Sequence, residues 1–316
     1  MSVTTVSDAA DSASYRLDST YFISFSMSHE TLRRALKVSS LLNIMQYRIL
    51  IRAFLSSPAA TPQSVLIDSL GLKPSAAAQA TAVLEEASFI VRQAGRSDAR
   101  ARDIFITEDG VAHIAQVNAA LVDELYRSWP TDTPLFRDIL ETVVYAGARI
   151  DPILSSGNSE RFPASHVVTT VELIAHRLEH DIVAGAGASL GECRIMQRLC
   201  EVGRPLRIGD LADQIFMNNA TATRNASKLC GRGWARKLVD PHDSKAVYLD
   251  LTEAGAQEAQ RICRIIDEAA YTRFWSIMNE EQREAFRQLG SVVIADLRRK
   301  KEAERLSALS LLRPMD

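Results

Sequence analysis

The chain has 316 residues, of which 47% are hydrophobic and 24% are charged, a balance typical of globular proteins and sufficient for about two domains. Its formal net charge is −2, which excludes a uniformly basic nucleic-acid-binding protein, so any such function must rest on local charge. No run of about 18 apolar residues occurs, which argues against a membrane-spanning helix.

The first 20 residues are rich in Ser, Thr, Ala and Asp and lack the apolar segment of a signal peptide. Residues 1–20 are therefore predicted to form a flexible arm. The four cysteines, Cys193, Cys200, Cys230 and Cys263, contain no C-x-x-C pair and are interpreted as reduced, buried side chains. Together these features predict a cytoplasmic protein that does not associate with a membrane.

An internal repeat organises the rest of the chain. Aligning Thr107 with Thr252 gives an offset of 252 − 107 = 145, and the same offset places Gly110 on Gly255. Further upstream, a shift of one more residue keeps the two halves in register. The repeat predicts a first domain over residues 21–150, a linker over 151–164 and a second domain over 165–316.

Each half contains the same series of three predicted helices, identified by apolar residues at helical spacing. The third helix of the second half has Asn218 or Asn219 as a candidate N-cap. In chain order, the members are helices over 45–54 and 194–200, short helices that begin at Thr61-Pro62 and span 208–215, and helices over 74–87 and 219–230.

After the third helix the apolar pattern becomes alternating, which predicts a β-hairpin with a charged tip. Thr107 and Thr252 follow the hairpins and are expected to cap the next helix. This order predicts a mainly α fold with small β-hairpin wings (α+β), as two tandem winged helix-turn-helix domains with a shared helical scaffold. The predicted strands are 90–93 with 103–106 and 235–239 with 246–251, and the scaffold helices span 28–42, 110–129, 133–148, 166–184, 252–277 and 279–306.

The segment LADQIFMNNATATRNASKLCGRGWARKLVDPHDSKAVYLDLTEAG, residues 211–255, combines an LA-x-x-L type helix, a helix with Ser/Thr and Arg, a charged wing and an LT-x-x-G strand end. It resembles the core of the MarR family of bacterial regulators, with Lys245 where Arg is usual. The first half resembles the family more loosely, through Asp98-x-Arg100 and the ITEDG of residues 106–110. The resemblance implies a sequence-specific DNA-binding transcriptional regulator that responds to a small-molecule effector.

The resemblance also bears on assembly. Members of the family dimerise through their first and last helices, whereas here both copies lie in one chain. The chain is therefore expected to act as a single-chain pseudo-dimer, as in the two-domain Sar-type regulators, or to associate further as a homodimer. Its partner would be double-stranded DNA, in the form of an asymmetric operator whose half-sites lie about one helical turn apart.

In a helix-turn-helix the second helix of the motif enters the major groove, and the wing reaches the minor groove. A stripe at i, i+3 and i+7, formed by Thr221, Arg224 and Lys228, is the favoured reading surface, with Asn219 at its start. A solvated helix face is the alternative. The predicted DNA-binding residues of the second copy are Asn218, Asn219, Thr221, Thr223, Arg224, Lys228, Lys237 and Lys245.

The first copy offers less chemistry for reading bases. Its third helix is rich in Ala and presents only Ser75 and Gln79 as readers. Its wing carries Arg96, Arg100 and Arg102, which are predicted to contact phosphates or the minor groove. The alternative is a salt-bridged hairpin tip formed with Asp98.

Three other patterns are interpreted as structural. His176-x-x-Glu179-His180 matches an inverted zinc-peptidase motif, but no third ligand follows, so no metal, cofactor or catalytic residue is predicted. Cys193 and Cys200 are seven apart on one helix, and core positions are favoured over a redox sensor. The aromatic candidates for lining an effector pocket, which otherwise belong to the core, are Trp129, Tyr145, Phe162, Trp234, Tyr271, Phe274 and Trp275.

The predicted function is thus that of a DNA-binding transcriptional regulator and not of an enzyme. The competing hypothesis is a tandem winged-helix scaffold that binds protein partners without reading DNA. The Arg224–Lys228 stripe and the charged wings favour the regulator, whereas the acidic pI and the reading helix of the first copy, which is poor in charge, leave room for the scaffold.

Overall fold

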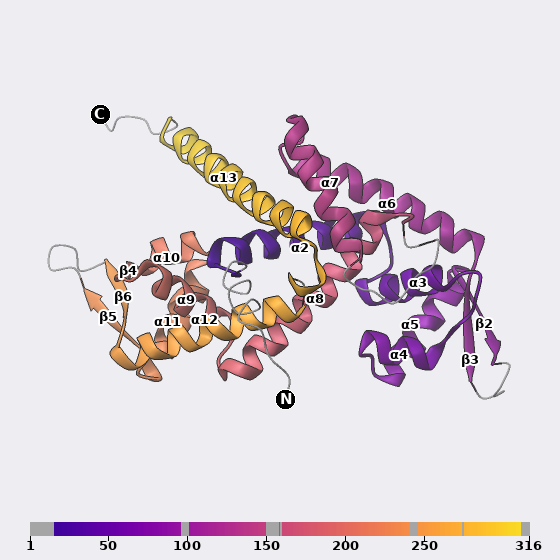
Figure 1. The fold of residues 1–316 in the computed structure, drawn as a ribbon, viewed down its shortest axis with the longest axis horizontal. Helices are drawn as coiled ribbons and strands as arrows, with labels where there is room; N and C mark the ends of the chain where they lie inside the picture. Colours follow the sequence, from indigo (N-terminus) through magenta and orange to yellow (C-terminus); the bar gives the residue numbers. More distant parts are fainter. Residues whose placement is uncertain are drawn as a thin grey trace, which may run out of the picture. The chain divides into compact units, whose positions relative to one another are not determined.

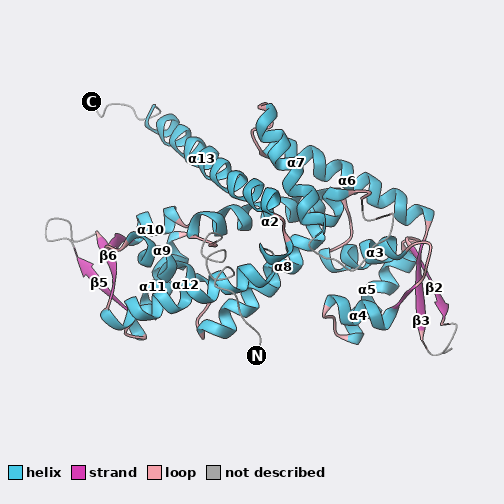
Figure 2. Cartoon of the chain, in the orientation of Figure 1, coloured by secondary structure: helices cyan, strands magenta, loops and turns pink. Residues whose placement is uncertain are grey.

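The structure is a computed structural model that describes residues 16–95, 101–149, 158, 160–239, 246–273 and 275–310. Helices predominate, with two small antiparallel sheets (Figures 1 and 2). The chain divides into two compact units. The N-unit comprises Met27–Leu173, and the C-unit comprises Met1–Ser26 together with Ile174–Asp316.

The N-unit contains one winged helix-turn-helix and the helices that support it. Its three-stranded sheet has the order β1-β3-β2, and Ile90 pairs with Ile106 at the end of the hairpin that lies away from its turn. Its elements are most of α2 (Ser19–Ser39), α3 (Ile44–Ser56), β1 (Thr61–Pro62), α4 (Gln63–Leu70), α5 (Pro74–Glu86), β2 (Ile90–Ala94), β3 (Arg102–Ile106), α6 (Glu108–Ser128), α7 (Pro134–Arg149) and the first part of α8 (Pro163–Ala186).

The C-unit contains the other winged helix-turn-helix. Its sheet has the order β4-β6-β5, with Ala235 paired to Leu251. Its elements are the start of α2, the rest of α8, α9 (Leu190–Val202), β4 (Leu206–Arg207), α10 (Ile208–Gln214), α11 (Asn219–Gly231), β5 (Ala235–Val239), β6 (Val247–Leu251), α12 (Glu253–Arg273), the 3₁₀ turn η1 (Trp275–Ile277) and α13 (Glu280–Ser310).

The predicted fold class is confirmed, and the two element series have the same order. The bounds of α5, β2, β3 and α6 fall on those of α11, β5, β6 and α12 after a shift of 145, as 219 − 74 shows for the first pair. Helices α3 and α9 differ by 146, as 190 − 44 shows. The helix expected to begin at Thr61-Pro62 differs, because these two residues pair with β3 as strand β1 and α4 begins after them.

A threonine–glycine corner fixes each wing to the helix that follows it. Thr252 Oγ1 donates to the Gly233 carbonyl at 2.7 Å and accepts from the Gly255 amide at 3.0 Å. A Cβ on Gly255 would lie 1.6 Å from the Trp234 carbonyl oxygen, so only glycine allows this approach. Thr107 makes the same pair of bonds at the same distances in the N-unit. The predicted caps are therefore confirmed, and each also anchors a hairpin.

The boundary between the units falls inside α2 and α8. In the C-unit, the Leu17 amide donates to Asp267 Oδ1 at 3.0 Å, and Gln197 Nε2 donates to the Leu17 carbonyl at 2.6 Å. In the N-unit, the buried Tyr47 hydroxyl donates to Ser165 Oγ on α8 at 2.7 Å. Each unit thus combines one winged helix with the start of the leading helix of the other repeat.

Residues from the predicted flexible arm and from the predicted linker also make structural contacts. Within the segment expected to be a flexible arm, Leu17 is buried and α2 begins at Ser19. Within the segment expected to be a linker, Asn158 Nδ2 donates to the carbonyls of Phe54 and Ser57. None of the helices in the described ranges is both long enough and apolar enough to cross a membrane.

Candidate nucleic-acid interface

Helix α11 is positioned by its own cap and by a buried inner face. Asn218 precedes it, and its side chain accepts a hydrogen bond from the Thr221 amide at 2.7 Å. This bond satisfies a backbone donor that the first helical turn leaves free. The inner face consists of Ala222, Asn225, Ala226 and Leu229, all buried. The opposite side of the helix is left to solvent.

The exposed side of α11 carries most of the predicted reading residues. Asn219, Thr223, Arg224 and Lys228 are exposed, whereas Thr221 is half-buried. Arg224 Nη2 lies 3.3 Å from Thr221 Oγ1, so these two polar groups are in contact. Residues 216–235 contain no acidic side chain, which makes this face locally cationic in a chain of net charge −2.

A serine that sequence reasoning missed joins the wing to this helix. Ser227 Oγ donates to the Thr223 carbonyl at 3.0 Å and accepts from Lys237 Nζ, on β5, at 3.0 Å. Ser227 lies four residues after Thr223, so its place on the exposed face was visible in the helical spacing. Its bond to Lys237 brings a wing cation against the last turns of α11.

Two other cations nearby are engaged by carboxylates. Arg232 Nε lies 3.1 Å from Glu192 Oε1, and its guanidinium stacks on the Trp234 ring at 4.9 Å. Burial raises the pKa of Glu192, but the hydrogen bonds from Ser189 and the charge of Arg232 hold that pKa below its usual value. Glu192 therefore stays charged and holds Arg232 in place.

Arg236 is likewise engaged, because its Nε donates to Asp250 Oδ2 at 2.9 Å across the hairpin. By contrast, Arg224, Lys228 and Lys237 form no ion pair with any carboxylate in the part of the chain that the structure describes. The charges of these three side chains are therefore available for charge-assisted hydrogen bonds to an anion. Charge-assisted bonds of this kind supply much of the affinity for DNA.

The corresponding face of α5 in the N-unit is chemically different. Ser75 and Gln79 are exposed, as expected, but the residues around them are Ala-rich. Val83 is 36% exposed at the position that Lys228 occupies in α11. With the offset of 145, the pairs on the outer faces are Ser75 with Ala220, Ala78 with Thr223, Gln79 with Arg224, Ala82 with Ser227 and Val83 with Lys228.

The cation on the first wing strand also has a different partner in the N-unit. Arg92 occupies the position of Lys237, and its Nε donates to Glu85 Oε2 at 2.8 Å. The hydrogen bond from Arg92 holds the pKa of Glu85 below its usual value despite some desolvation. Arg92 is therefore paired with a carboxylate of α5, the helix that corresponds to α11, whereas Lys237 is paired with the neutral hydroxyl of Ser227.

The wing tips hold the remaining predicted contacts. Arg96, Arg100 and Lys245, together with Asp98 and Asp243, lie outside the described residues. Arg102 is exposed at the start of β3, where it pairs with Ala94 of β2.

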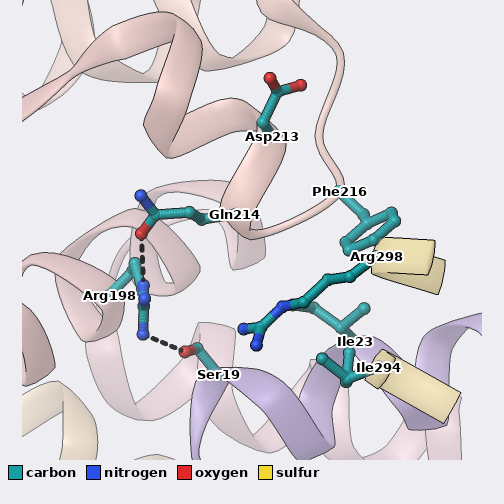
Figure 3. A pocket seen from close by; sticks show the side chains of 8 residues that line it. All are labelled: Ser19, Ile23, Arg198, Asp213, Gln214, Phe216, Ile294 and Arg298. Carbon is teal, nitrogen blue, oxygen red and sulfur yellow. Dashed lines mark hydrogen bonds between the residues drawn. The ribbon is translucent and has the colours of Figure 1, made fainter. Parts of the chain in front are cut away.

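A small cavity of about 170 Å³ lies beside the start of α11 (Figure 3). Two guanidinium groups, from Arg198 and Arg298, point toward it together with the Ser19 hydroxyl. None of the aromatic residues suggested from sequence lines it, and Phe216 is the aromatic residue that does. Phe274 lies outside the described residues, and Trp275 is buried. The cavity is lined by Ser19, Ile23, Arg198, Asp213, Gln214, Phe216, Ile294 and Arg298.

The other patterns from the sequence have ordinary surroundings. His176 and His180 are exposed on α8, and the described ranges contain no cluster of three or more residues suited to bind a metal. Burial raises the pKa of the Cys193 thiol to about 12. Burial and the adjacent Cys200 thiol raise the pKa of Cys263 to about 12 as well. Thiolates are the reactive form, so both positions suit packing better than redox sensing.

No family model matches the chain, and no curated protein matches it. Several solved structures are similar to less than half of it. Sco3205, a MarR family transcriptional regulator from Streptomyces coelicolor in complex with DNA, is 20% identical over 40% of this chain and 82% of its own, with a TM-score of 0.37. AbsC, a MarR family regulator from the same organism, is 20% identical over 43% and 86%, with a TM-score of 0.33. A MarR family regulator from Silicibacter pomeroyi is 21% identical over 40% and 87%, with a TM-score of 0.35.

Proposed function

We propose that the chain is a MarR-like transcriptional regulator that binds specific double-stranded DNA, with α11 in the major groove and the wings in the minor groove. The observation that carries the proposal is the exposed face of α11. There Arg224 and Lys228, with Lys237 of β5 beside them, form a cationic surface without an acidic neighbour in residues 216–235. Arg and Asn side chains at such a face suit guanine and adenine edges, and Lys suits phosphate.

The two winged helices would contribute unequally to this function. The face of α5 lacks cations at the positions of Arg224 and Lys228, and Arg92 is held by Glu85. Specific reading would therefore be concentrated in the C-unit. The N-unit would add weak base reading through Ser75 and Gln79, and contacts to phosphates or the minor groove through the wing residues Arg96, Arg100 and Arg102. An operator with one strongly specified half-site follows from this inequality.

A single chain would supply both winged helices to one operator. The starts of the two leading helices support this part of the proposal, because each lies in the unit that holds the winged helix of the other repeat. Such a pair resembles a dimer whose subunits have been joined. The mass of the complex with a minimal operator would test it: one chain for each DNA duplex supports the pseudo-dimer, and two chains support a further homodimer.

The cavity beside α11 is the proposed effector site. Two guanidinium groups and a hydroxyl at one side, with Ile23, Ile294 and Phe216 at the other, suit a small anion that carries an apolar group (Figure 3). Phe216 and Gln214 belong to the segment that leads into α11. A ligand there would contact the reading motif directly, which is the requirement for coupling ligand to DNA affinity.

The competing function, a scaffold that binds proteins through its winged helices, is favoured by one observation. The exposed face of α5 carries no cation where α11 has Arg224 and Lys228, and it includes Val83 with neighbouring Ala78 and Ala82. This function would leave the α11 face unused.

The deciding experiment is selection of binding sites from a random-sequence DNA library with the full chain, followed by affinity measurement across salt. A regulator enriches a defined motif, binds it at least about a thousand times more tightly than scrambled DNA, and loses affinity steeply as salt rises. Failure to enrich any motif, with only weak binding to all duplexes, would favour the scaffold.

A further inference from the structure

Two arginines of α9 connect the start of α2 to the end of α10. Arg194 stacks its guanidinium on the Phe22 ring of α2 at 5.2 Å and donates through Nη2 to the Ile215 carbonyl. Arg198 donates through Nε to Gln214 Oε1 at 2.9 Å. The two arginines are four residues apart, so they extend from the same face of α9.

Arg198 completes the second connection through a hydroxyl of α2. Its Nη1 lies 3.5 Å from Ser19 Oγ and 3.3 Å from Glu201 Oε2, and the bonds to Gln214 and Ser19 are visible in Figure 3. Ser19 is itself fixed, because its amide donates to Glu201 Oε1 at 2.8 Å. Three elements thus meet through one guanidinium.

The position of Arg194 is unusual for a charged side chain. Arg194 is half-buried, and the loss of solvent around its guanidinium lowers the pKa of that group to about 10. Burying a charge is unfavourable unless it is hydrogen-bonded, and the Phe22 ring and the Ile215 carbonyl compensate Arg194 for the water it loses. The presence of an arginine at such a site indicates a specific structural role and not a contribution to solubility.

The carbonyl that Arg194 binds lies at a critical point of the backbone. Ile215 is the C-cap residue that follows α10, and Phe216 comes next with φ of +49°, a conformation that L residues rarely adopt. Three residues later α11 begins. A tether on this turn therefore constrains the direction in which the reading helix leaves it.

The same arginine spacing recurs in the other repeat, although the reading residues do not. The sequence RIMQR, residues 194–198, corresponds to RILIR, residues 48–52, at the offset of 146. In the N-unit, Arg52 is buried, and the charge of Arg48 helps to lower the pKa of Glu172 on α8. Both halves contain this arginine pair, whereas the exposed faces of α5 and α11 differ.

We propose that Arg194 and Arg198 are positioning residues that make the orientation of α11 depend on the first turns of α2. Helix α2 continues beyond Ser26 into the N-unit, so the leading helix of one repeat sets the reading helix of the other. The proposal rests on the proposed function only for what α11 binds. The mechanical coupling between α2 and the α10–α11 turn stands independently of it.

Amide hydrogen exchange tests the coupling without DNA. In the full chain, Phe22→Leu and Arg198→Gln should each speed exchange of the amides at 215–221 by about tenfold, while the hairpin β5–β6 keeps its wild-type rate. Arg194→Lys, which keeps the charge but loses the flat stacking surface, should show a smaller effect in the same segment. Arg264→Gln, at an exposed position of α12, is the matched control and should change nothing.

The second measurement is the affinity of each variant for the selected operator. Phe22→Leu and Arg198→Gln should each lower specific affinity about tenfold, while their binding to scrambled DNA stays within twofold, because phosphate contacts tolerate a tilted helix better than base contacts do. Unchanged exchange at 215–221 in all three variants, with wild-type melting temperatures, would overturn the coupling. If the wild-type chain selects no DNA motif but its exchange responds as described, the proposed function fails and the coupling survives.

Discussion

Lys237 Nζ lies 3.0 Å from Ser227 Oγ, so the first strand of the C-terminal wing is tied by its side chain to the reading helix. The hydroxyl can accept this bond because its proton is directed to the Thr223 carbonyl, 3.0 Å away. In the N-unit the same two positions are Ala82 and Arg92, and no such bond is available between them. The bond therefore belongs to the copy that is proposed to read DNA.

Removing the hydroxyl should release the lysine. We expect Ser227→Ala and Lys237→Met each to weaken operator binding by roughly threefold to tenfold, since a neutral hydrogen bond or one phosphate contact is worth about 1 kcal/mol. The double variant should lose little more than Lys237→Met alone, because both changes disrupt one unit.

The measurement is a double-mutant cycle on operator affinity at fixed salt. Ser291→Ala is the control, since Ser291 Oγ also bonds the carbonyl four residues earlier, on α13, but receives no lysine. Fully additive losses in the double variant would show that Ser227 does not act through Lys237.

Base reading should be concentrated at Arg224. Arg224→Ala should cost about 1–3 kcal/mol of specific binding and relax the preference at one base position. Gln79→Ala, at the corresponding position of α5, should cost much less, because its neighbours Ala78, Ala82 and Val83 offer no cation to fix a reading geometry.

Parallel site selection with the two variants and the wild type would check this. A selected motif that loses information at one position with Arg224→Ala, and keeps it with Gln79→Ala, is the expected result. The reverse pattern would assign the reading role to the N-unit and contradict the asymmetry.

Local chemistry accounts for what the sequence predicted of this fold. Alternating apolar residues indicated both hairpins, and the Thr252 cap followed from a threonine placed before an acidic first turn. The fold class could be derived because each element is specified by residues within a few positions of one another. The same locality explains why Asn218 was a candidate cap.

The contacts at the candidate site were harder to predict from the sequence, because they join residues that are far apart in the chain. Arg194 and Phe22, which stack on each other, are separated by more than half of the sequence, and no periodic pattern predicts their contact. Asn225 shows a further limit: it falls in the polar run of α11, yet it is buried, with its Nδ2 3.7 Å from Met217 Sδ. Only packing decides which polar residues of such a helix face inward.

The glycine corner provides a stability prediction. Gly255→Ala should destabilise the C-unit by roughly 2–4 kcal/mol, because its Cβ would lie 1.6 Å from the Trp234 carbonyl oxygen and the hairpin would have to move away. Gly209→Ala is the matched control, since its Cβ would meet nothing closer than Asn219 Oδ1 at 4.0 Å. In α10 that change should stabilise by about 0.5–1 kcal/mol through helix propensity. Chemical denaturation of the two variants would measure both changes in the free energy of unfolding. A small loss with Gly255→Ala would show that the threonine–glycine corner can accommodate a Cβ.

Acid should weaken the N-unit through Glu172. His29 Nε2 lies 2.6 Å from Glu172 Oε2, and this hydrogen bond, aided by the charges of His29, Arg33 and Arg48, holds the pKa of Glu172 below its usual value. A carboxyl whose pKa is lower in the folded than in the unfolded state stabilises the fold above its unfolded pKa. That contribution is lost as the pH falls through the folded pKa. The acid window therefore lies below the usual pKa of a glutamate, about 4.3.

Glu172→Gln removes the titrating group while keeping the shape of the side chain. Its melting temperature should be lower than that of the wild type at pH 7, and the gap should narrow as the pH is lowered from 5 to 3. Calorimetry of both proteins across this range is the measurement, with Glu179→Gln, at an exposed position of α8, as the control. A gap of constant size down to pH 3 would show that the ion pair contributes nothing that depends on the charge of Glu172.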